Sequence, residues 1–422
     1  MKRRTLLAAA AAGAVAGTLA ARPRDRGAGG HDSYFAGLQR ELRAHGLARP
    51  TMLVDLDRLD HNIAELQRWL NPAHAYRVVA KSLPSLPLLE HVMAASDTRR
   101  LMVFHQPFLN AIAAARPDAD LLLGKPMPAA AAAAFYAGHR GDLDPARQLQ
   151  WLIDSEQRLA EYRELAEGLG IAMRINVEID VGLHRGGLRK PSELQRLLSA
   201  IDAHPRLQFS GLMGYEPHVA KAPPLLGLQR RAFADATERY RQFIDAWRRH
   251  SGRDDTGDLT LNAAGSPTFR LWKPVTGIAN ELAAGSGLVK PTDFDIPTLD
   301  THRPAAFIAA PVLKAGDGMA LPIVPAIGKL QAAWNPNRRR SFFIYGGYWK
   351  AHPESPAGLS VNPLYGRSTN QELLNGSPRV ALDAGDHVFL RPTQSEFVML
   401  QFGDLAVIRG GRIVDAWPVL PG

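Results

Sequence analysis

The sequence predicts an α/β fold in which a (β/α)8 TIM-like barrel is followed by a mostly antiparallel β-domain. Between about residues 51 and 290, short apolar runs alternate about eight times with helical patterns. Such alternation is typical of parallel strands joined by crossover helices. The number of runs and the length of the region favour a closed barrel over an open doubly wound sheet. After about residue 298 the sequence changes to short, β-rich segments separated by turns.

Eight apolar runs are the expected strands of the first region. In order, they are 51–56, 76–80, 101–104, 121–123, 149–153, 173–180, 207–213 and 259–262. Each is followed by a segment with helical periodicity. After the first run, Asp57 is placed to cap a helix that extends through Leu70.

The last part of the chain has the pattern of a separate β-domain. The expected strands are 305–313, 342–345, 388–391, 397–402 and 405–409. Gly410 and Gly411 between two apolar runs indicate a hairpin. Segment 351–377 is rich in Pro, Gly, Ser and Asn, which predicts a long functional loop. We therefore expect an export signal and linker over 1–30, a barrel over 45–297 and a β-domain over 298–422.

The first residues have the pattern of an export signal. Arg3 and Arg4 precede Leu6 and Leu7, and an Ala-rich run then extends to about residue 21. The paired arginines resemble a twin-arginine signal, and an ordinary Sec signal is the alternative. The run is too short and too rich in Ala and Gly to predict a membrane-spanning helix. These features predict a periplasmic protein that has no contact with the membrane once the signal is removed.

Composition excludes several kinds of chemistry. The 422-residue chain has no cysteine, which rules out disulfides, thiolate metal sites and a cysteine nucleophile. The net charge is +9, but the basic residues are scattered or lie in the leader, so we do not expect a nucleic-acid partner.

Lys81 is the first candidate for chemistry, because it directly follows the expected strand 76–80. In a barrel, reactive groups lie at the C-terminal ends of strands. An amine partly shielded from water there is more easily held in the neutral form that a Schiff base requires. A surface lysine that extends its stem over apolar neighbours is the alternative explanation.

Three further strand ends carry polar residues. They are 178–187 with Glu178, Asp180, His184 and Arg185, 210–218 with Tyr215 and His218, and 261–268 with Gly265, Ser266 and Thr268. A turn of small residues such as the last can present backbone N–H groups to a phosphate. Glycine-rich turns are common in barrels, and His218 has an ordinary explanation as a loop histidine. Together, however, these ends supply an amine, an anion-binding turn and ring-contacting groups at one barrel mouth.

These motifs resemble the fold-type III pyridoxal phosphate (PLP) enzymes, which include alanine racemase, D-threonine aldolase and eukaryotic-type D-serine dehydratase. The resemblance covers about residues 45–420. It rests on segment 51–81 with its strand-end lysine, on 180–187 as a D-x-G-x-x-R-x-G turn, and on 211–215, 265–268, 281–285, 385–392 and 407–418. The last two segments resemble the D-threonine aldolase and D-serine dehydratase branch.

The resemblance implies a role for each candidate residue. Lys81 would carry PLP as a Schiff base and act in catalysis. Gly265, Ser266 and Thr268 would hold the cofactor's phosphate. Arg185 and Tyr215 would bind the cofactor near its ring and lie close to the substrate, with Tyr215 as the second catalytic residue.

The sequence also departs from this branch. Gln394 and Glu396 occupy the places of its two metal ligands, so we expect no zinc site and at most a weak divalent site. Ser82 and Leu83 replace a Thr-His pair after the lysine, and Ala283 replaces an arginine.

The leading interpretation is a PLP-dependent lyase or aldolase acting on a small D- or β-hydroxy amino acid. A racemase and a periplasmic protein that binds PLP or an amino acid without turnover are the alternatives. The expected partner is therefore a small amino-acid substrate. The identity and chirality of that substrate stay open, as does a homodimer.

Overall fold

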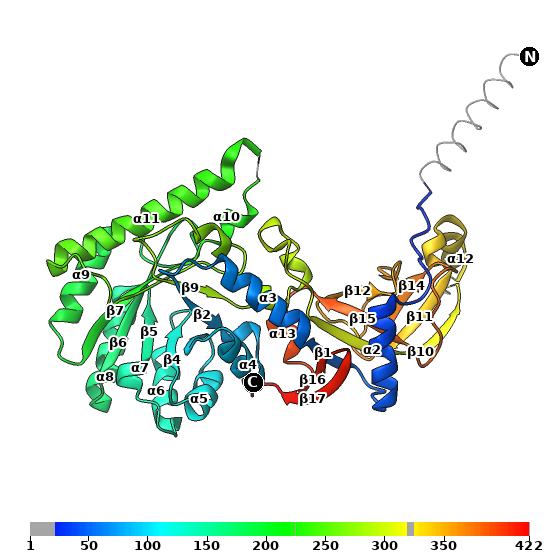
Figure 1. The fold of residues 1–422 in the computed structure, drawn as a ribbon, viewed down its shortest axis with the longest axis horizontal. Coiled ribbons are helices and arrows are strands. Elements are labelled where there is room, and N and C mark those ends of the chain that lie inside the picture. The colour runs from blue at the N-terminus through cyan, green and yellow to red at the C-terminus, as the bar shows by residue number, and fades with distance from the viewer. Residues whose placement is uncertain (1–21, 224, 319–324, 422) are drawn as a thin grey trace, which may run out of the picture. The chain divides into compact units, whose positions relative to one another are not determined.

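The computed structural model describes residues 22–223, 225–318 and 325–421. It confirms the predicted fold class, because it contains a closed barrel of parallel strands and a mostly antiparallel sheet (Figure 1). The predicted export signal falls almost entirely on residues 1–21, which lie outside the described residues.

The chain folds into two compact units that are not consecutive blocks of sequence. The described residues of Val54–Ala306, Gln394–Val407 and Asp415–Gly422 form the unit that contains the barrel. Those of Met1–Leu53, Phe307–Thr393 and Ile408–Val414 form the second unit.

The barrel is closed by parallel pairing of its first and last strands, with Tyr76 opposite Leu282. In spatial order its strands are β2 (Ala75–Val79), β3 (Arg100–Val103), β4 (Asp120–Leu123), β5 (Leu149–Ile153), β6 (Met173–Ile179), β7 (Leu207–Gly214), β8 (Thr260–Ala263) and β9 (Glu281–Ala284). These runs are almost entirely buried, as expected for strands covered on both faces.

The predicted series of barrel strands was wrong at its start and lacked the last strand, whereas its final run, 259–262, is confirmed as β8. Run 51–56 forms β1 (Thr51–Asp55), which belongs to the antiparallel sheet and not to the barrel. The eighth barrel strand is instead β9, a four-residue run with two alanines that has neither β-branched nor aromatic residues. Because β1 ends at Asp55, this residue and not Asp57 caps the next helix, accepting from the backbone N–H of Arg58 at 3.0 Å.

Helices precede the first barrel strand and connect the successive barrel strands from β2 to β8 (Figure 1). They are α3 (Leu56–Trp69), α4 (Leu86–Ala95), α5 (Gln106–Ala115), α6 (Ala129–Gly138), α7 (Pro145–Gln148), α8 (Glu156–Leu169), α9 (Pro191–Asp202), α10 (Pro217–Lys221) and α11 (Leu228–Ser251). Short 3-10 helices follow three strands: η1 (Ala80–Ser82) after β2, η3 (Phe269–Trp272) after β8 and η4 (Ser286–Leu288) after β9.

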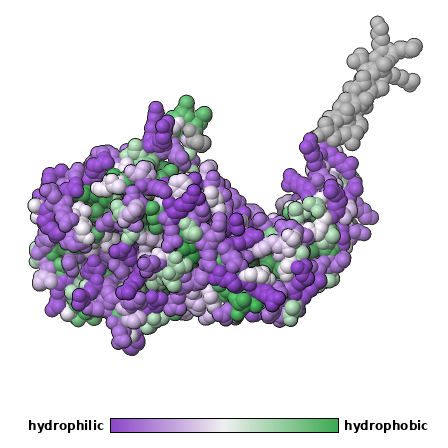
Figure 2. Space-filling model, in the orientation of Figure 1, coloured by the Kyte–Doolittle hydropathy of each residue, from purple (hydrophilic) through white to green (hydrophobic). Residues whose placement is uncertain are grey.

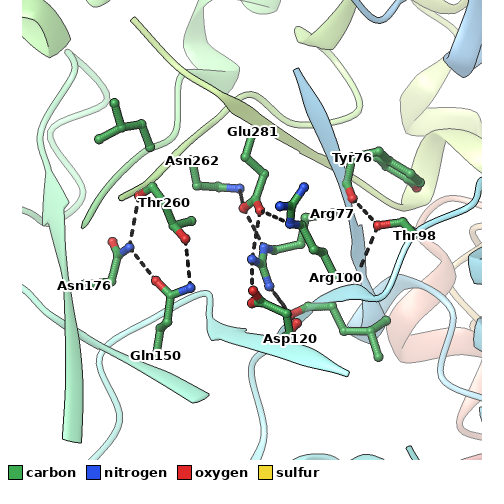
Figure 3. A network of polar contacts seen from close by, with 12 residues as sticks. Tyr76, Arg77, Thr98, Arg100, Asp120, Gln150, Asn176, Thr260, Asn262 and Glu281 are labelled. Atoms are coloured by element: carbon green, nitrogen blue, oxygen red, sulfur yellow. Dashed lines mark hydrogen bonds and ion pairs between the residues drawn. The ribbon is translucent and has the colours of Figure 1, made fainter. Parts of the chain in front are cut away.

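A polar network fills part of the barrel interior (Figure 3). Arg77 is fully buried and donates to Glu281 at 2.5 and 2.8 Å and to the Asp120 side chain at 2.8 Å. Asn262 donates to the same Glu281 carboxylate at 2.8 Å. Because a buried charge without a partner is costly, these contacts allow the Arg77 and Glu281 charges to be buried inside the barrel.

The second unit is built on antiparallel strands. β10 (Ala306–Asp317) pairs with β11 (Arg340–Tyr345) and with β15 (His387–Pro392), β11 pairs with β14 (Gln371–Gly376), β14 with β13 (Ser360–Val361), and β15 with β12 (Ala351–Ser355). Two helices, α2 (Ser33–Ala44) and α12 (Pro325–Trp334), belong to the same unit.

Two predictions for the C-terminal region were wrong and one was confirmed. Segment 351–377 is not a loop, because it contains β12, β13 and β14, whose backbone pairing holds its polar residues in strands. Segment 397–402 is not a strand, because most of it lies in or follows the short helix α13 (Ser395–Met399). The hairpin is present between β16 (Asp404–Arg409) and β17 (Arg412–Pro418), and Gly410 and Gly411 both have the positive φ that its turn requires.

The visible surface is mostly polar, with an apolar tip where the chain passes from α10 to α11 (Figure 2). Leu225 and Leu226 are 71% and 76% exposed there. None of the described helices is long and apolar enough to cross a membrane.

Candidate active site

A cavity of about 670 Å³ lies at the C-terminal ends of the barrel strands. Its volume suits a small-molecule site. Five of the six predicted site residues contribute to its lining, namely Lys81, Arg185, Tyr215, Gly265 and Ser266. The lining also contains residues that sequence reasoning did not select as site residues, among them Phe104, Lys125, Asp154, Glu178 and Glu396.

Lys81 enters the cavity from η1, immediately after β2. Its Nζ atom lies 3.0 Å from one carboxylate oxygen of Glu396 and 3.4 Å from the other. The same nitrogen lies 4.7 Å from the centre of the Phe104 ring, which adds a cation–π contact. Glu396 and Phe104 thus hold the amine on two sides. Because the side chain is 39% exposed, the amine remains open to the cavity.

Arg185 and Tyr215 form a pair beyond the ends of the neighbouring strands β6 and β7. The guanidinium carbon of Arg185 lies 5.2 Å from the centre of the Tyr215 ring. Burial raises the pKa of the Tyr215 phenol, so the phenol keeps its proton. The ring packs against Gly265, where a Cβ atom would lie 2.5 Å from a ring carbon. Only glycine therefore permits the ring to occupy this position.

Ser266 is oriented as a hydrogen-bond donor. Its Oγ atom accepts from the backbone N–H groups of Gly285 at 3.1 Å and Gly287 at 2.9 Å. Both of its acceptor positions are thus occupied, and the hydroxyl proton is left for another group. Among the described residues, the backbone N–H groups of Gly265, Ser266 and Ser286 make no backbone–backbone hydrogen bond in these turns.

These donors come together because the turn after β9 approaches the end of β2 closely. A Cβ atom at Gly285 would lie 2.8 Å from the carbonyl oxygen of Val79 and 2.9 Å from Cβ of Ser82. The result is a concave group of one hydroxyl and several N–H donors beside Lys81, which is the donor set that a phosphate requires.

Thr268 differs from the other predicted residues, because it is fully buried and its hydroxyl points away from the cavity lining. Its Oγ1 atom donates to Oε1 of Glu216 at 2.6 Å. Glu216 also accepts from Trp272 Nε1 at 3.0 Å and from the backbone N–H of Ala264 at 3.3 Å. Burial raises the pKa of this carboxyl group. Glu216 therefore holds the turn that follows β8 in place by hydrogen bonds. A contact between Thr268 and phosphate stays a prediction.

Glu178 was seen in the sequence as part of a strand-end motif but was not selected as a site residue. Burial and then the carboxylate of Asp154 raise its pKa to about 7, and Arg185 acts in the opposite direction. A carboxyl group of this kind exchanges protons near neutral pH. The sequence signal for Phe104, Asp154 and Lys125 was their position at the end of a predicted strand. Phe104 is the last residue of run 101–104, Asp154 directly follows run 149–153, and Lys125 follows run 121–123 after Gly124.

Glu396 and Gln394 lie at the cavity through α13 and its N-cap. Among the described residues, no group of three or more His, Asp or Glu side chains is arranged to hold a metal ion. Glu396 is instead paired with Lys81, as described above.

Comparison with known proteins identifies the family to which this chain belongs. The family model of the alanine racemase N-terminal domain matches residues 54–273, which is more than half of the chain. The chain belongs to the alanine racemase N-terminal domain family. Members of this family are fold-type III PLP enzymes.

Two solved structures resemble nearly the whole chain of this family member. A D-threonine aldolase from Filomicrobium marinum has a TM-score of 0.69 and 18% identity, over 88% of this chain and 95% of that chain. A D-threo-3-hydroxyaspartate dehydratase from Delftia sp. HT23 has a TM-score of 0.66 and 17% identity, over 88% and 97%. At this identity the likeness shows the fold.

A curated alanine racemase of Acidithiobacillus ferrooxidans is 36% identical over 94 residues. That match covers 21% of this chain and 21% of the racemase, so the chain matches about a fifth of this relative's length.

The residues present fit the family's cofactor. The turns that carry Ser266 and Gly285 present a hydroxyl and backbone N–H donors, Gly285 lets its turn pack against Val79 and Ser82, and Lys81 lines the same cavity. Ser266 and the backbone of Gly265 and Ser286 would hold the phosphate of PLP. Lys81 supplies the amine that the cofactor's aldehyde requires.

Proposed function

We propose that this protein is a PLP-dependent lyase of the aldolase type that acts on a small D- or β-hydroxy amino acid, with the cofactor held as a Schiff base on Lys81. The observation that carries the proposal is the pairing of an open amine with a donor cradle in one cavity. Lys81 and Ser266 both line it, and Gly285 lets the turn that donates to Ser266 pack closely against the end of β2, from which Lys81 follows.

When bound, PLP supplies an electron sink that stabilises the carbanion formed at Cα of the amino acid. The protein's own groups would then bind, orient and move protons. The pocket has a volume suited to a small substrate, and its cations, Lys125 and Arg185, are suited to the substrate's carboxylate. Once the substrate has taken its place on the cofactor, the free amine of Lys81 would act as a base.

Tyr215 is the second group that we assign to proton movement. It lines the cavity and keeps its proton because burial raises its pKa. The nearby Arg185 cation opposes that shift and would stabilise negative charge on the phenol. These features support Tyr215 as a donor to the substrate and not as a cofactor anchor.

The first experiment identifies the cofactor lysine. Protein expressed with PLP should absorb visible light, and Lys81→Ala should be colourless, while the exposed Lys190→Ala serves as a matched control that stays coloured. Borohydride reduction followed by peptide mass mapping should place the pyridoxyl group on Lys81. A label on another lysine, or a colourless wild-type protein that PLP cannot reconstitute, would contradict the assignment.

The second experiment identifies the reaction. The coloured protein is incubated with a panel of D- and L-amino acids, and the products are separated by chiral chromatography. We expect glycine and an aldehyde from a β-hydroxy amino acid. Appearance of the opposite enantiomer without cleavage would support a racemase, which the similarity to an alanine racemase makes the second candidate. Spectral change without any product would support a binding protein.

A further inference from the structure

Glu396 is the carboxylate that lies closest to the reactive amine. Its two oxygens are 3.0 and 3.4 Å from Lys81 Nζ. The side chain is 36% exposed, and it lines the same cavity as Tyr215 and Ser266. Its negative charge also contributes to raising the pKa of Tyr215, so it acts on both groups that we assign to proton movement.

Other carboxylates of the barrel differ from Glu396 in their surroundings. Glu178 and Asp154 line the same cavity, but burial and then the Asp154 carboxylate raise the pKa of Glu178 to about 7, so it holds its proton more tightly than an ordinary carboxyl group. Glu281 is 3% exposed and accepts from Arg77 and Asn262. Glu216 is 1% exposed and accepts from three donors. Among the described residues, Glu396 has Lys81 as its hydrogen-bonding partner, which leaves several acceptor positions on its oxygens for a ligand.

The ion pair with Lys81 also indicates the form in which Glu396 acts. Both carboxylate oxygens of Glu396 accept from the Lys81 amine, at 3.0 and 3.4 Å, and a group that accepts a hydrogen bond in this way can also accept a proton. A substrate amine that displaces Lys81 takes over the position of its nitrogen. A hydroxyl on Cβ is three bonds from that amine, so it would be within reach of the Glu396 carboxylate, which lies 3.0 Å from the Lys81 nitrogen.

We infer that Glu396 is the base that removes the proton from the β-hydroxyl group of the substrate, so that this chain cleaves β-hydroxy amino acids without a metal ion. The inference rests on the proposed function and names its substrate class. Gln394, the other cavity residue of this segment, is a neutral amide, and one amide with one carboxylate makes a weak pair of metal ligands.

The step balances without a further reactant. Glu396 takes the hydroxyl proton, and the electron pair of the O–H bond becomes the second bond of an aldehyde C=O group. The Cα–Cβ bond breaks, and its electron pair stays on Cα, where the cofactor stabilises it. A proton then returns to Cα, so the amino acid yields glycine and one aldehyde, and Glu396 gives its proton back to solvent.

The test compares two reactions of the PLP-loaded protein, one that involves a β-hydroxyl and one that does not. The first is cleavage of a β-hydroxy amino acid, measured as aldehyde release. The second is exchange of the α-proton of glycine in deuterium oxide, followed by NMR. Glu396→Gln should lower cleavage by about 10²- to 10⁴-fold, the usual contribution of a general base, and lower exchange by a much smaller factor. Glu238→Gln, an exposed ion-paired carboxylate on α11, is the matched control and should change neither.

Two further measurements separate catalysis from structure. Formate added to Glu396→Ala should restore part of the cleavage, because it can occupy the space of the missing carboxylate. The pH midpoint of the visible absorbance should fall in Glu396→Gln, because an anion 3.0 Å from the nitrogen that carries the cofactor has been removed.

Several outcomes would overturn the inference. Wild-type cleavage in Glu396→Gln, or an equal fall of cleavage and exchange, would show that Glu396 does not accept this proton. Stoichiometric zinc whose removal by EDTA abolishes cleavage would assign the role to a metal. A colourless wild-type protein, or one that releases no aldehyde from any β-hydroxy amino acid, would instead refute the proposed function, and the inference would fall with it.

Discussion

Glu178 and Asp154 line the same cavity and repel each other's charge. Burial is the larger cause of the raised pKa of Glu178, which reaches about 7 against an ordinary value of 4.5. Arg185 reduces this shift but does not cancel it. At neutral pH the cavity therefore contains one carboxyl group that is close to half-protonated, and it lies beside the guanidinium that we place near the cofactor ring.

The pKa of Glu178 predicts how stability changes with pH. Between about pH 4.5 and pH 7, the unfolded chain releases this proton and the folded chain retains it, so the free energy of unfolding falls as pH rises. Glu178→Gln removes the effect. The free energy of unfolding of the variant, relative to that of the wild type, should therefore be up to about 3 kcal/mol higher at pH 8 than at pH 4.5. Thermal or urea unfolding at the two pH values measures this difference, with Glu238→Gln as the control. An identical pH dependence in wild type and Glu178→Gln would show that this carboxyl group titrates normally.

The phenol of Tyr215 gives a second prediction at this scale. Tyr215→Phe keeps the ring that packs on Gly265 and beside Arg185, and it removes only the hydroxyl. We expect the variant to bind PLP with an unchanged visible spectrum and to turn over about 10²- to 10⁴-fold more slowly. Absorbance titration and product analysis measure the two properties. Loss of colour would instead assign Tyr215 to cofactor binding.

The turns after β8 and β9 act together as one element. The Ser266 hydroxyl accepts from the N–H groups of Gly285 and Gly287, which ties one turn to the other. Glu216, which follows β7, holds the first turn from beneath through Thr268 and Ala264. Three neighbouring strand ends therefore share a single hydrogen-bond network, and the phosphate cradle depends on all of them.

Gly285 is where this element tolerates no side chain. In Gly285→Ala the new Cβ would lie 2.8 Å from the carbonyl oxygen of Val79, which is backbone that has little freedom to move. We expect Gly285→Ala to displace the turn, to weaken PLP binding by at least tenfold and to lower the melting temperature. Gly168→Ala in α8 is the matched control, because its Cβ would meet nothing within 4 Å. It should raise helix stability by about 0.5–1 kcal/mol and leave PLP affinity unchanged. Equal PLP affinity in both variants would show that the cradle does not depend on this approach.

At the scale of the whole chain, the segment that follows the predicted signal is hydrogen-bonded within the second unit. Arg22 donates to the carbonyl of Trp334 at 3.0 Å. Asn337 accepts from the backbone N–H of Arg26 at 2.8 Å and donates to the carbonyl of Arg24 at 2.7 Å. We therefore propose that the signal is removed before Arg22, since a later cut would delete these contacts.

The export proposal has a direct test. Replacing Arg3 and Arg4 with lysine should leave the precursor in the cytoplasm, because the twin-arginine pathway requires that pair. Cell fractionation measures the location, and N-terminal sequencing of the exported wild type measures the cleavage site. Export of the variant would indicate the Sec route. PLP would then have to be acquired after export, because Sec substrates cross the membrane unfolded and the twin-arginine pathway transports folded proteins.

Much of the fold and part of the candidate site could be predicted from the residues in order. Lys81, Gly265 and Ser266 each follow an apolar run, and the C-terminal ends of parallel strands meet at one mouth. Local pattern was enough for these residues because their position depends on strand order alone. It was not enough for β9, whose four residues Glu281–Ala284 show no strand signal and are fixed by pairing with β2 and β8.

The sequence by itself determined which residue types stand at the barrel mouth and where the chain alternates between strand and helix. Only the tertiary structure decided which of those groups interact. Lys81 and Glu396 are 315 positions apart, and no periodicity links them, yet their charges lie 3.0 Å apart. The direction of the Thr268 hydroxyl and the raised pKa of Glu178 likewise depend on what surrounds each side chain. Burial, electrostatic pairing and hydrogen-bond geometry act between neighbours in space, and local sequence specifies the strand on which a residue lies but not those neighbours.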